Sequence, residues 1–151
     1  MPQESRFGEV YKFDGSDTYF MLSFMVKPDD DKYIIYSVRG SLPHEVDMSL
    51  CYKKMDEIVK EFLVLFEDAE KFEDSFDHPI DPSGRSKASM IMFKLQSGDE
   101  ISVSCIDFEE KLRIKNNWGD GLSIAIDSKE VNFCLLIKLI FVLDNNRILN
   151  T

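Results

Sequence analysis

Carboxylates are the most frequent chemistry-bearing side chains in this chain, and many of them are concentrated in the stretch 66–82, FEDAEKFEDSFDHPIDP. That stretch has one lysine, Lys71, and these carboxylates: Glu67, Asp68, Glu70, Glu73, Asp74, Asp77 and Asp81. Carboxylates can bind a metal ion, transfer protons or face a basic protein. Their spacing and their neighbours decide among these chemistries.

A metal site is not predicted, because the acidic runs lack the ligand spacing of known sites. A calcium-binding loop places oxygen ligands at alternating positions, has a glycine at its turn and ends in a bidentate glutamate. The run 29–31 (DDD) and the run 14–17 (DGSD) do not follow this pattern. No glycine-rich loop of the phosphate-binding type occurs either. We therefore expect no metal and no other cofactor.

Catalytic side chains are also hard to assign. His44 lies at an expected helix start and His78 precedes a proline in a loop, where capping or surface roles are typical. Cys105 lies in the middle of an expected strand, where a buried and inert thiol is usual. No GxSxG or HExxH motif occurs. We predict that the protein is not an enzyme, although two of its carboxylates could still meet as a glycosidase-type pair.

Helical spacing would align part of the acidic stretch. With 100° per residue, Glu67, Glu70, Asp74 and Asp77 fall within about 80° of one another on a helical wheel. Like charges at this spacing destabilise a helix by about 0.2–0.5 kcal/mol per pair, and acids at the C-terminal end oppose the helix dipole. The stripe is therefore either a solvated helix end or a surface for a basic partner.

The second interpretation gives a set of candidate partner-binding residues. To the stripe it adds Asp68 and Asp81 from the same stretch. Trp118, in the turn NNWGDG, is a further candidate, because a lone tryptophan in a turn can anchor an interface. The alternative for Trp118 is that it folds back and caps the sheet.

The distribution of charge indicates what kind of partner to expect. The net charge is −10, and residues 1–82 have 19 acidic and 9 basic side chains, whereas residues 83–151 have 9 of each. An acidic surface repels phosphate, so binding to nucleic acid or to an anionic membrane is disfavoured. The basic stretch 111–115 (KLRIK) is interpreted as a solvated strand face. The expected partner is a basic protein.

The elements that position these residues follow from apolar periodicity. Strands are expected at 10–14, 18–26 and 33–40, followed by a helix from Val46 to about Phe72. After a loop at 78–87, strands are expected at 87–95, 100–108, 111–115 and 121–126, followed by a helix from Asp127 to about Leu143. The predicted fold class is α+β, with two antiparallel sheet units that are each followed by a long helix.

Size and cysteine content indicate the number of domains and the expected redox state of the thiols. A chain of 151 residues is expected to form a single domain, 1–151, with an internal boundary at the 78–87 loop. The three cysteines, Cys51, Cys105 and Cys134, are odd in number and lack metal-type spacing, which favours buried free thiols. No stretch predicts a secretory signal or a bilayer span. A soluble, cytoplasmic protein is expected.

The order of elements resembles a group of known proteins. The strands TYFMLSFMV and YIIYSVRG lead into the helix Cys51–Phe72, and SMIMFKL, EISVSCIDF and GLSIAI lead into the helix Asp127–Leu143. This twofold arrangement of strands and a helix is similar to the Whirly-type plan. It also resembles immunity proteins of bacterial contact-dependent growth inhibition and related polymorphic toxin systems, which are small, often acidic and without catalytic motifs.

The resemblance implies a function. An immunity protein, or antitoxin, binds a basic toxin domain, often a nuclease, and occludes its active-site cleft. Carboxylates would then take the place of the phosphates that the cleft is built to bind. Two alternatives stay open: an acidic secretion chaperone, and an enzyme of a type that its motifs do not reveal.

Overall fold

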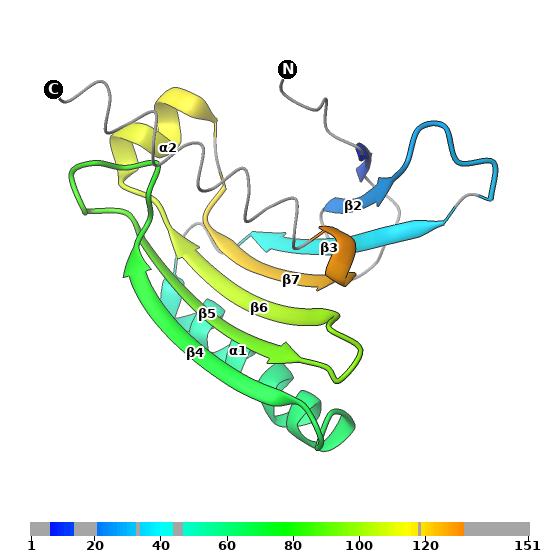
Figure 1. Cartoon of the computed structure of the whole chain (residues 1–151). Helices are drawn as coiled ribbons and strands as arrows, with labels where there is room; N and C mark the ends of the chain where they lie inside the picture. Colours follow the sequence, from blue (N-terminus) through cyan, green and yellow to red (C-terminus); the bar gives the residue numbers. More distant parts are fainter. Residues whose placement is uncertain (1–6, 14–20, 33, 44–46, 118, 132–151) are drawn as a thin grey trace, which may run out of the picture.

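One antiparallel sheet of seven strands forms the body of the protein (Figure 1). The computed structural model describes residues 7–13, 21–32, 34–43, 47–117 and 119–131. The strands lie in the order β1-β2-β3-β7-β6-β5-β4. Their bounds are β1 Gly8–Phe13, β2 Met21–Val26, β3 Ile35–Pro43, β4 Glu70–Asp77, β5 Lys87–Lys94, β6 Glu100–Asp107 and β7 Gly121–Asp127. Helix α1, Met48–Leu65, lies between β3 and β4 in the sequence, and helix α2, Glu110–Asn116, lies between β6 and β7.

The predicted pair of separate sheet units is wrong. Strand β7 pairs with β3 on one side and with β6 on the other, so it joins the first strands and the later strands into one sheet. The likeness to the Whirly-type plan is lost with it. The reason is that the pairing of Val38 with Ile126 links positions far apart in the sequence, and local periodicity carries no information about such pairings. The expected helix 127–143 lies outside the described residues from position 132 on.

Helix α1 begins where the sequence indicated but ends earlier. The Asp47 side chain caps its start by accepting a hydrogen bond from the Ser49 backbone N–H at 2.9 Å. The helix ends at Leu65, and a turn closed by the Ala69 N–H and the Phe66 carbonyl at 3.0 Å leads into β4. The prediction of a helix as far as Phe72 is wrong. Phe66 and Ala69 suited a helical stripe, yet they meet the core from this turn.

The core lies between α1 and one face of β5, β6 and β7. The buried stripe of α1 consists of Cys51, Met55 and Val59. It packs against Ile91 and Phe93 of β5, Ile101, Val103 and Cys105 of β6, and Leu122 of β7. These residues alternate along their strands, as the period of two requires. The Phe93 ring also contacts Phe62 of α1 at a centroid distance of 5.9 Å.

A disulfide crosses this core. Cys51 of α1 and Cys105 of β6 are both fully buried and are bonded to each other, with their Cα atoms 6.1 Å apart. The expectation of free thiols is therefore wrong for these two residues, and Cys134 lies outside the described residues. The two bonded cysteines are separated by 54 positions in the sequence. Their types and spacing alone could not reveal this pairing.

The stretch KLRIK is a helix and not the expected strand. The Glu109 side chain caps α2 by accepting from the Leu112 N–H at 3.0 Å. Asn117 ends the helix in the left-handed conformation, with φ of 54°. The alternation of charged and apolar residues over only five positions also suits one and a half turns of helix. Among the described helices, none has the length and apolarity needed to cross a bilayer.

The core assignment predicts a large loss of stability on truncation of Phe93. Phe93→Ala should lower the free energy of unfolding by about 3–5 kcal/mol, because it leaves a cavity between α1 and the sheet. Val64→Ala is the control, since Val64 is 78% exposed, and it should change stability by less than about 0.5 kcal/mol. Urea titration of both variants measures this. Equal losses would place Phe93 outside the core.

The disulfide predicts the number of reactive thiols. Of the three cysteines, Cys51 and Cys105 are bonded, so denatured but unreduced protein should react at Cys134 alone. A disulfide that closes a loop of this length stabilises a protein by about 4 kcal/mol in the chain-entropy model, so reduction should lower the urea midpoint. Thiol titration with and without reductant gives the count. Reaction of all cysteines before reduction would contradict the bond.

Candidate functional site

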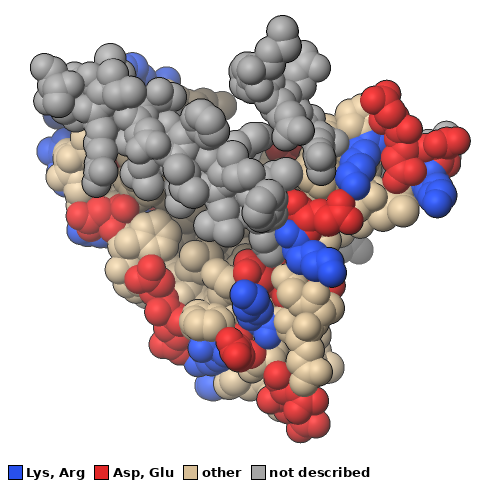
Figure 2. Space-filling view, in the orientation of Figure 1, with Lys and Arg blue, Asp and Glu red and all other residues tan. Residues whose placement is uncertain are grey.

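The acidic stretch forms an edge of the sheet. β4 is the last strand in the order, pairs with β5 alone and is exposed at every position. We call its exposed carboxylates, with two in the preceding turn, the β4 acidic edge: Glu67, Asp68, Glu70, Glu73, Asp74 and Asp77. In Figure 2 acidic side chains follow the edge on which β4 lies and gather at the tip where α1 turns into β4.

The expected helical stripe does not exist, because a strand sends alternate side chains to opposite faces. Glu70 and Asp74 share one face of β4, whereas Asp77 lies on the other face with Glu73. Glu67 precedes the strand in the turn. The structure therefore brings these carboxylates to one edge of the sheet but not to one face.

Ion pairs neutralise part of this edge. Lys87 of β5 contacts Asp77 at 2.5 Å, and Lys71 contacts Glu73. Among the described residues, no ion pair joins a cation to the remaining carboxylates, which are Glu67, Asp68, Glu70 and Asp74. The unneutralised charge therefore lies on the turn and on the face of β4 that bears Glu70 and Asp74.

Asp81 is not part of this surface, which corrects its prediction as a partner-binding residue. It is only 5% exposed and holds the 78–87 loop together. One oxygen accepts from the Ser83 hydroxyl at 2.6 Å and from the Ser83 N–H at 2.9 Å. The other accepts from the Ser86 hydroxyl at 2.8 Å and the Ser86 N–H at 2.9 Å. These bonds, led by the Ser83 hydroxyl, hold the pKa of Asp81 well below its usual range.

The Asp81 network continues into α2. The Ser86 hydroxyl oxygen accepts from the Glu109 N–H at 2.9 Å, just before that helix. Arg85 also reaches the Glu109 carboxylate at 3.8 Å. These contacts fix the loop beside α2 and give its charged groups a structural role. Trp118, the remaining candidate, lies outside the described residues.

Two aromatic side chains on the edge were missed by sequence reasoning. Phe72 is 49% exposed and Phe76 is 36% exposed, and both lie on the face of β4 that bears Glu70 and Asp74. Helical periodicity assigned Phe72 to the end of a helix. The alternation in EKFEDSFD, with phenylalanine four positions after phenylalanine, was the signal that could have indicated a strand.

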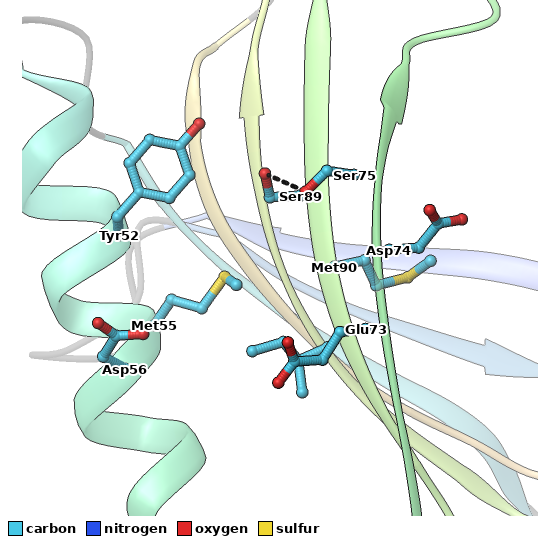
Figure 3. Close-up of a pocket in the computed structure, with 9 residues that line it drawn as sticks. Tyr52, Met55, Asp56, Glu73, Asp74, Ser75, Ser89 and Met90 are labelled. Carbon is cyan, nitrogen blue, oxygen red and sulfur yellow. Dashed lines mark hydrogen bonds between the residues drawn. The ribbon is translucent and has the colours of Figure 1, made fainter.

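A groove of about 380 Å³ lies between α1 and the strands β4 and β5 (Figure 3). Tyr52 and Met55 extend from α1 toward the sheet, and Glu73 extends from β4 toward the helix. The Ser75 and Ser89 hydroxyls meet at 3.2 Å across the two strands. A cation that entered the groove would meet the Tyr52 ring, whereas the Glu73 carboxylate already pairs with Lys71.

The chemistry of the other candidates is limited. Within the described ranges, no group of histidine, cysteine and carboxylate side chains could hold a metal ion. Burial lowers the pKa of His78, whose ring packs against Phe108 at 5.2 Å and whose Nδ1 accepts from the Ile80 N–H at 3.3 Å. Cys105 is in the disulfide, so it is not available as a nucleophile. His44 lies outside the described residues.

Comparison with known proteins gives no match, whether to a family model, to a curated protein or to a solved structure. The interpretation of the site therefore rests on its own geometry.

The depressed pKa of Asp81 predicts acid sensitivity. Stability from its hydrogen bonds is fully present above the unfolded carboxyl pKa of about 3.9 and is lost as the pH falls below it toward the folded pKa. Asp81→Asn should lower the melting temperature at pH 7, and the difference from wild type should shrink below about pH 4. Melting curves across pH measure this. The control Asp74→Asn, at an exposed position, should leave them unchanged, and a constant Asp81→Asn difference would contradict the assignment.

Proposed function

We propose that this protein binds a basic protein domain through the β4 acidic edge and inhibits that domain. The observation that carries the proposal is the set of exposed carboxylates that form no ion pair among the described residues, Glu67, Asp68, Glu70 and Asp74, next to the exposed rings of Phe72 and Phe76. Carboxylates supply attraction over distance, and buried aromatic rings supply contact energy.

Charge of this kind increases the rate of association with a basic partner. Complementary charges can bring association to about 10⁸–10⁹ M⁻¹s⁻¹ at low salt, and the effect weakens as salt screens the charges. The same surface repels phosphate groups, so nucleic acids and anionic membranes are poor candidates. A basic protein that itself binds nucleic acid is the complementary partner.

The specific form of the proposal is an immunity protein for a nuclease-type toxin. The edge would lie over a cationic cleft and exclude nucleic acid from it. The single sheet removes the architectural part of the resemblance to immunity proteins, so this form rests on charge, on the exposed rings and on the groove beside β4.

A secretion chaperone is the second candidate, and one observation favours it. Leu63, Val64 and Leu65 at the end of α1 are exposed by 46%, 78% and 69%. Exposed apolar residues of this kind can mark a contact between subunits. A chaperone of this class would be a dimer with apolar contact surfaces, so sedimentation of the purified protein separates the two candidates.

The cytoplasmic location is part of this proposal. Free thiols were one of the features that favoured it, whereas the Cys51–Cys105 disulfide is typical of oxidising compartments. An immunity protein acts where its toxin acts, so cell fractionation of the tagged protein tests this part of the proposal directly.

Co-expression tests the inhibitor function. The probe is the product of the neighbouring reading frame, if that product has a basic C-terminal domain. The protein should restore growth and form a stable complex with that domain. Glu70→Gln combined with Asp74→Asn should slow association at least tenfold at low salt and flatten its salt dependence, since both changes remove unpaired charge from the edge.

The matched control removes the same charge elsewhere. Asp29→Asn combined with Asp31→Asn changes two exposed carboxylates at the turn after β2. This variant should associate at nearly the wild-type rate. Equal slowing in both variants would assign the effect to net charge and remove the β4 acidic edge from the interface.

A further inference from the structure

We propose that β4 accepts an extended basic segment of its partner as an additional strand of the sheet. This inference rests on the proposed function and specifies how the partner binds. In this mode the partner binds through main-chain hydrogen bonds along the open edge of the sheet, and not through side-chain contacts alone.

The edge is open along its full length. β4 hydrogen-bonds to β5 from Glu70 to Asp77, and no other described backbone group bonds to these eight residues. All eight are exposed, so none of the described residues covers the strand. An edge strand has unpaired N–H and C=O groups at alternate residues, and these can bond to another chain. At about 3.3 Å per residue, β4 offers an edge of about 26 Å.

A second copy of this chain does not fit the edge. Pairing β4 with β4 in either direction would set carboxylates beside carboxylates, and like charges opposite each other in a sheet are destabilising. Charged side chains on edge strands are a common means of preventing such self-pairing. The same charges favour a strand of opposite sign.

The side chains of β4 specify the sequence of that strand. On one face, Glu70 and Asp74 alternate with Phe72 and Phe76, so the partner needs basic residues opposite the acids and apolar residues opposite the rings. On the other face, Glu73 and Asp77 favour further basic residues in the partner strand. These residues would compete with Lys71 and Lys87, which already pair with the two carboxylates.

An antiparallel partner strand would then have the sequence Lys-Val-Thr-Lys-Lys-Val-Thr-Lys. Its lysines lie opposite Glu70, Glu73, Asp74 and Asp77, and its valines lie opposite Phe72 and Phe76. Threonine fills the two remaining positions because it suits a strand. A parallel partner would carry the same residues in reverse order.

Peptide binding to the full chain tests the inference. Titration calorimetry at low salt compares this peptide with the same peptide N-methylated at its central backbone amides. The N-methylated peptide keeps every charge and side chain but cannot pair as a strand. We expect it to bind at least tenfold more weakly. Equal affinity would overturn strand addition while leaving docking by charge intact.

Proline substitution in β4 tests the same inference by changing this protein instead of the peptide. Adjacent residues of an edge strand point their N–H groups in opposite directions, so one of Asp74→Pro and Ser75→Pro should spare the pairing with β5. The variant that retains the wild-type melting temperature should lose binding of the unmodified peptide at least tenfold. Retained binding in that variant would overturn the inference, as would absence of peptide binding to the wild-type chain.

A failure of these tests is distinguishable from a failure of the proposed function. One outcome is that both peptides bind with equal affinity, while the basic domain binds the wild-type chain and binds the Glu70→Gln, Asp74→Asn variant more weakly. In that case only strand addition is wrong. If the domain also binds that variant normally, the proposed docking surface is wrong as well.

Discussion

The packing of α1 against β5, β6 and β7 is the contact on which the rest of the structure depends. Cys51, Met55 and Val59 supply the helix side of this core, and the bond from Cys51 to Cys105 fixes the helix across the sheet. One helix of this length cannot cover seven strands. α1 packs over β5, β6 and β7, whereas β4 pairs with β5 alone among the described strands and is exposed at every position. The exposure of β4 follows from where the core lies, and its open edge follows from its place at the end of the strand order.

An exposed edge strand is a hazard, since it can pair with any other strand. The carboxylates of β4 limit that hazard because they repel another acidic strand, and in the proposed function the same charges favour a basic partner. This gives one physical account of two observations, the acidic composition of β4 and its exposed rings at Phe72 and Phe76. Asp81 shows that not every acid in the stretch has this role, because its oxygens are fully used by the 78–87 loop.

Sequence periodicity predicted the parts of the fold that depend on local pattern. The strands at 87–95 and 100–108 and the turn at Gly98 are confirmed, because alternation and a glycine with φ of 89° are local features. The join between β7 and β3 and the Cys51–Cys105 bond depend on distant pairs, so the sequence could not reveal them. The end of α1 was misplaced because Phe66 and Ala69 satisfy both a helix and a turn. Because the helix was predicted to extend beyond Leu65, the acidic residues of β4 were interpreted as a helical stripe. For the same reason Phe72 and Phe76 were not recognised as exposed residues of an edge strand.

Residue-by-residue amide hydrogen exchange over residues 70–77 tests the central claim most directly. The claim is that the acidic stretch is an edge strand with one side of its backbone unpaired. It predicts that protected amides, bonded to β5, alternate along β4 with amides that exchange rapidly into solvent. Unbroken protection from α1 through Asp77 would mean that the helix continues, and uniformly rapid exchange would mean that no strand forms. Either result would contradict the account.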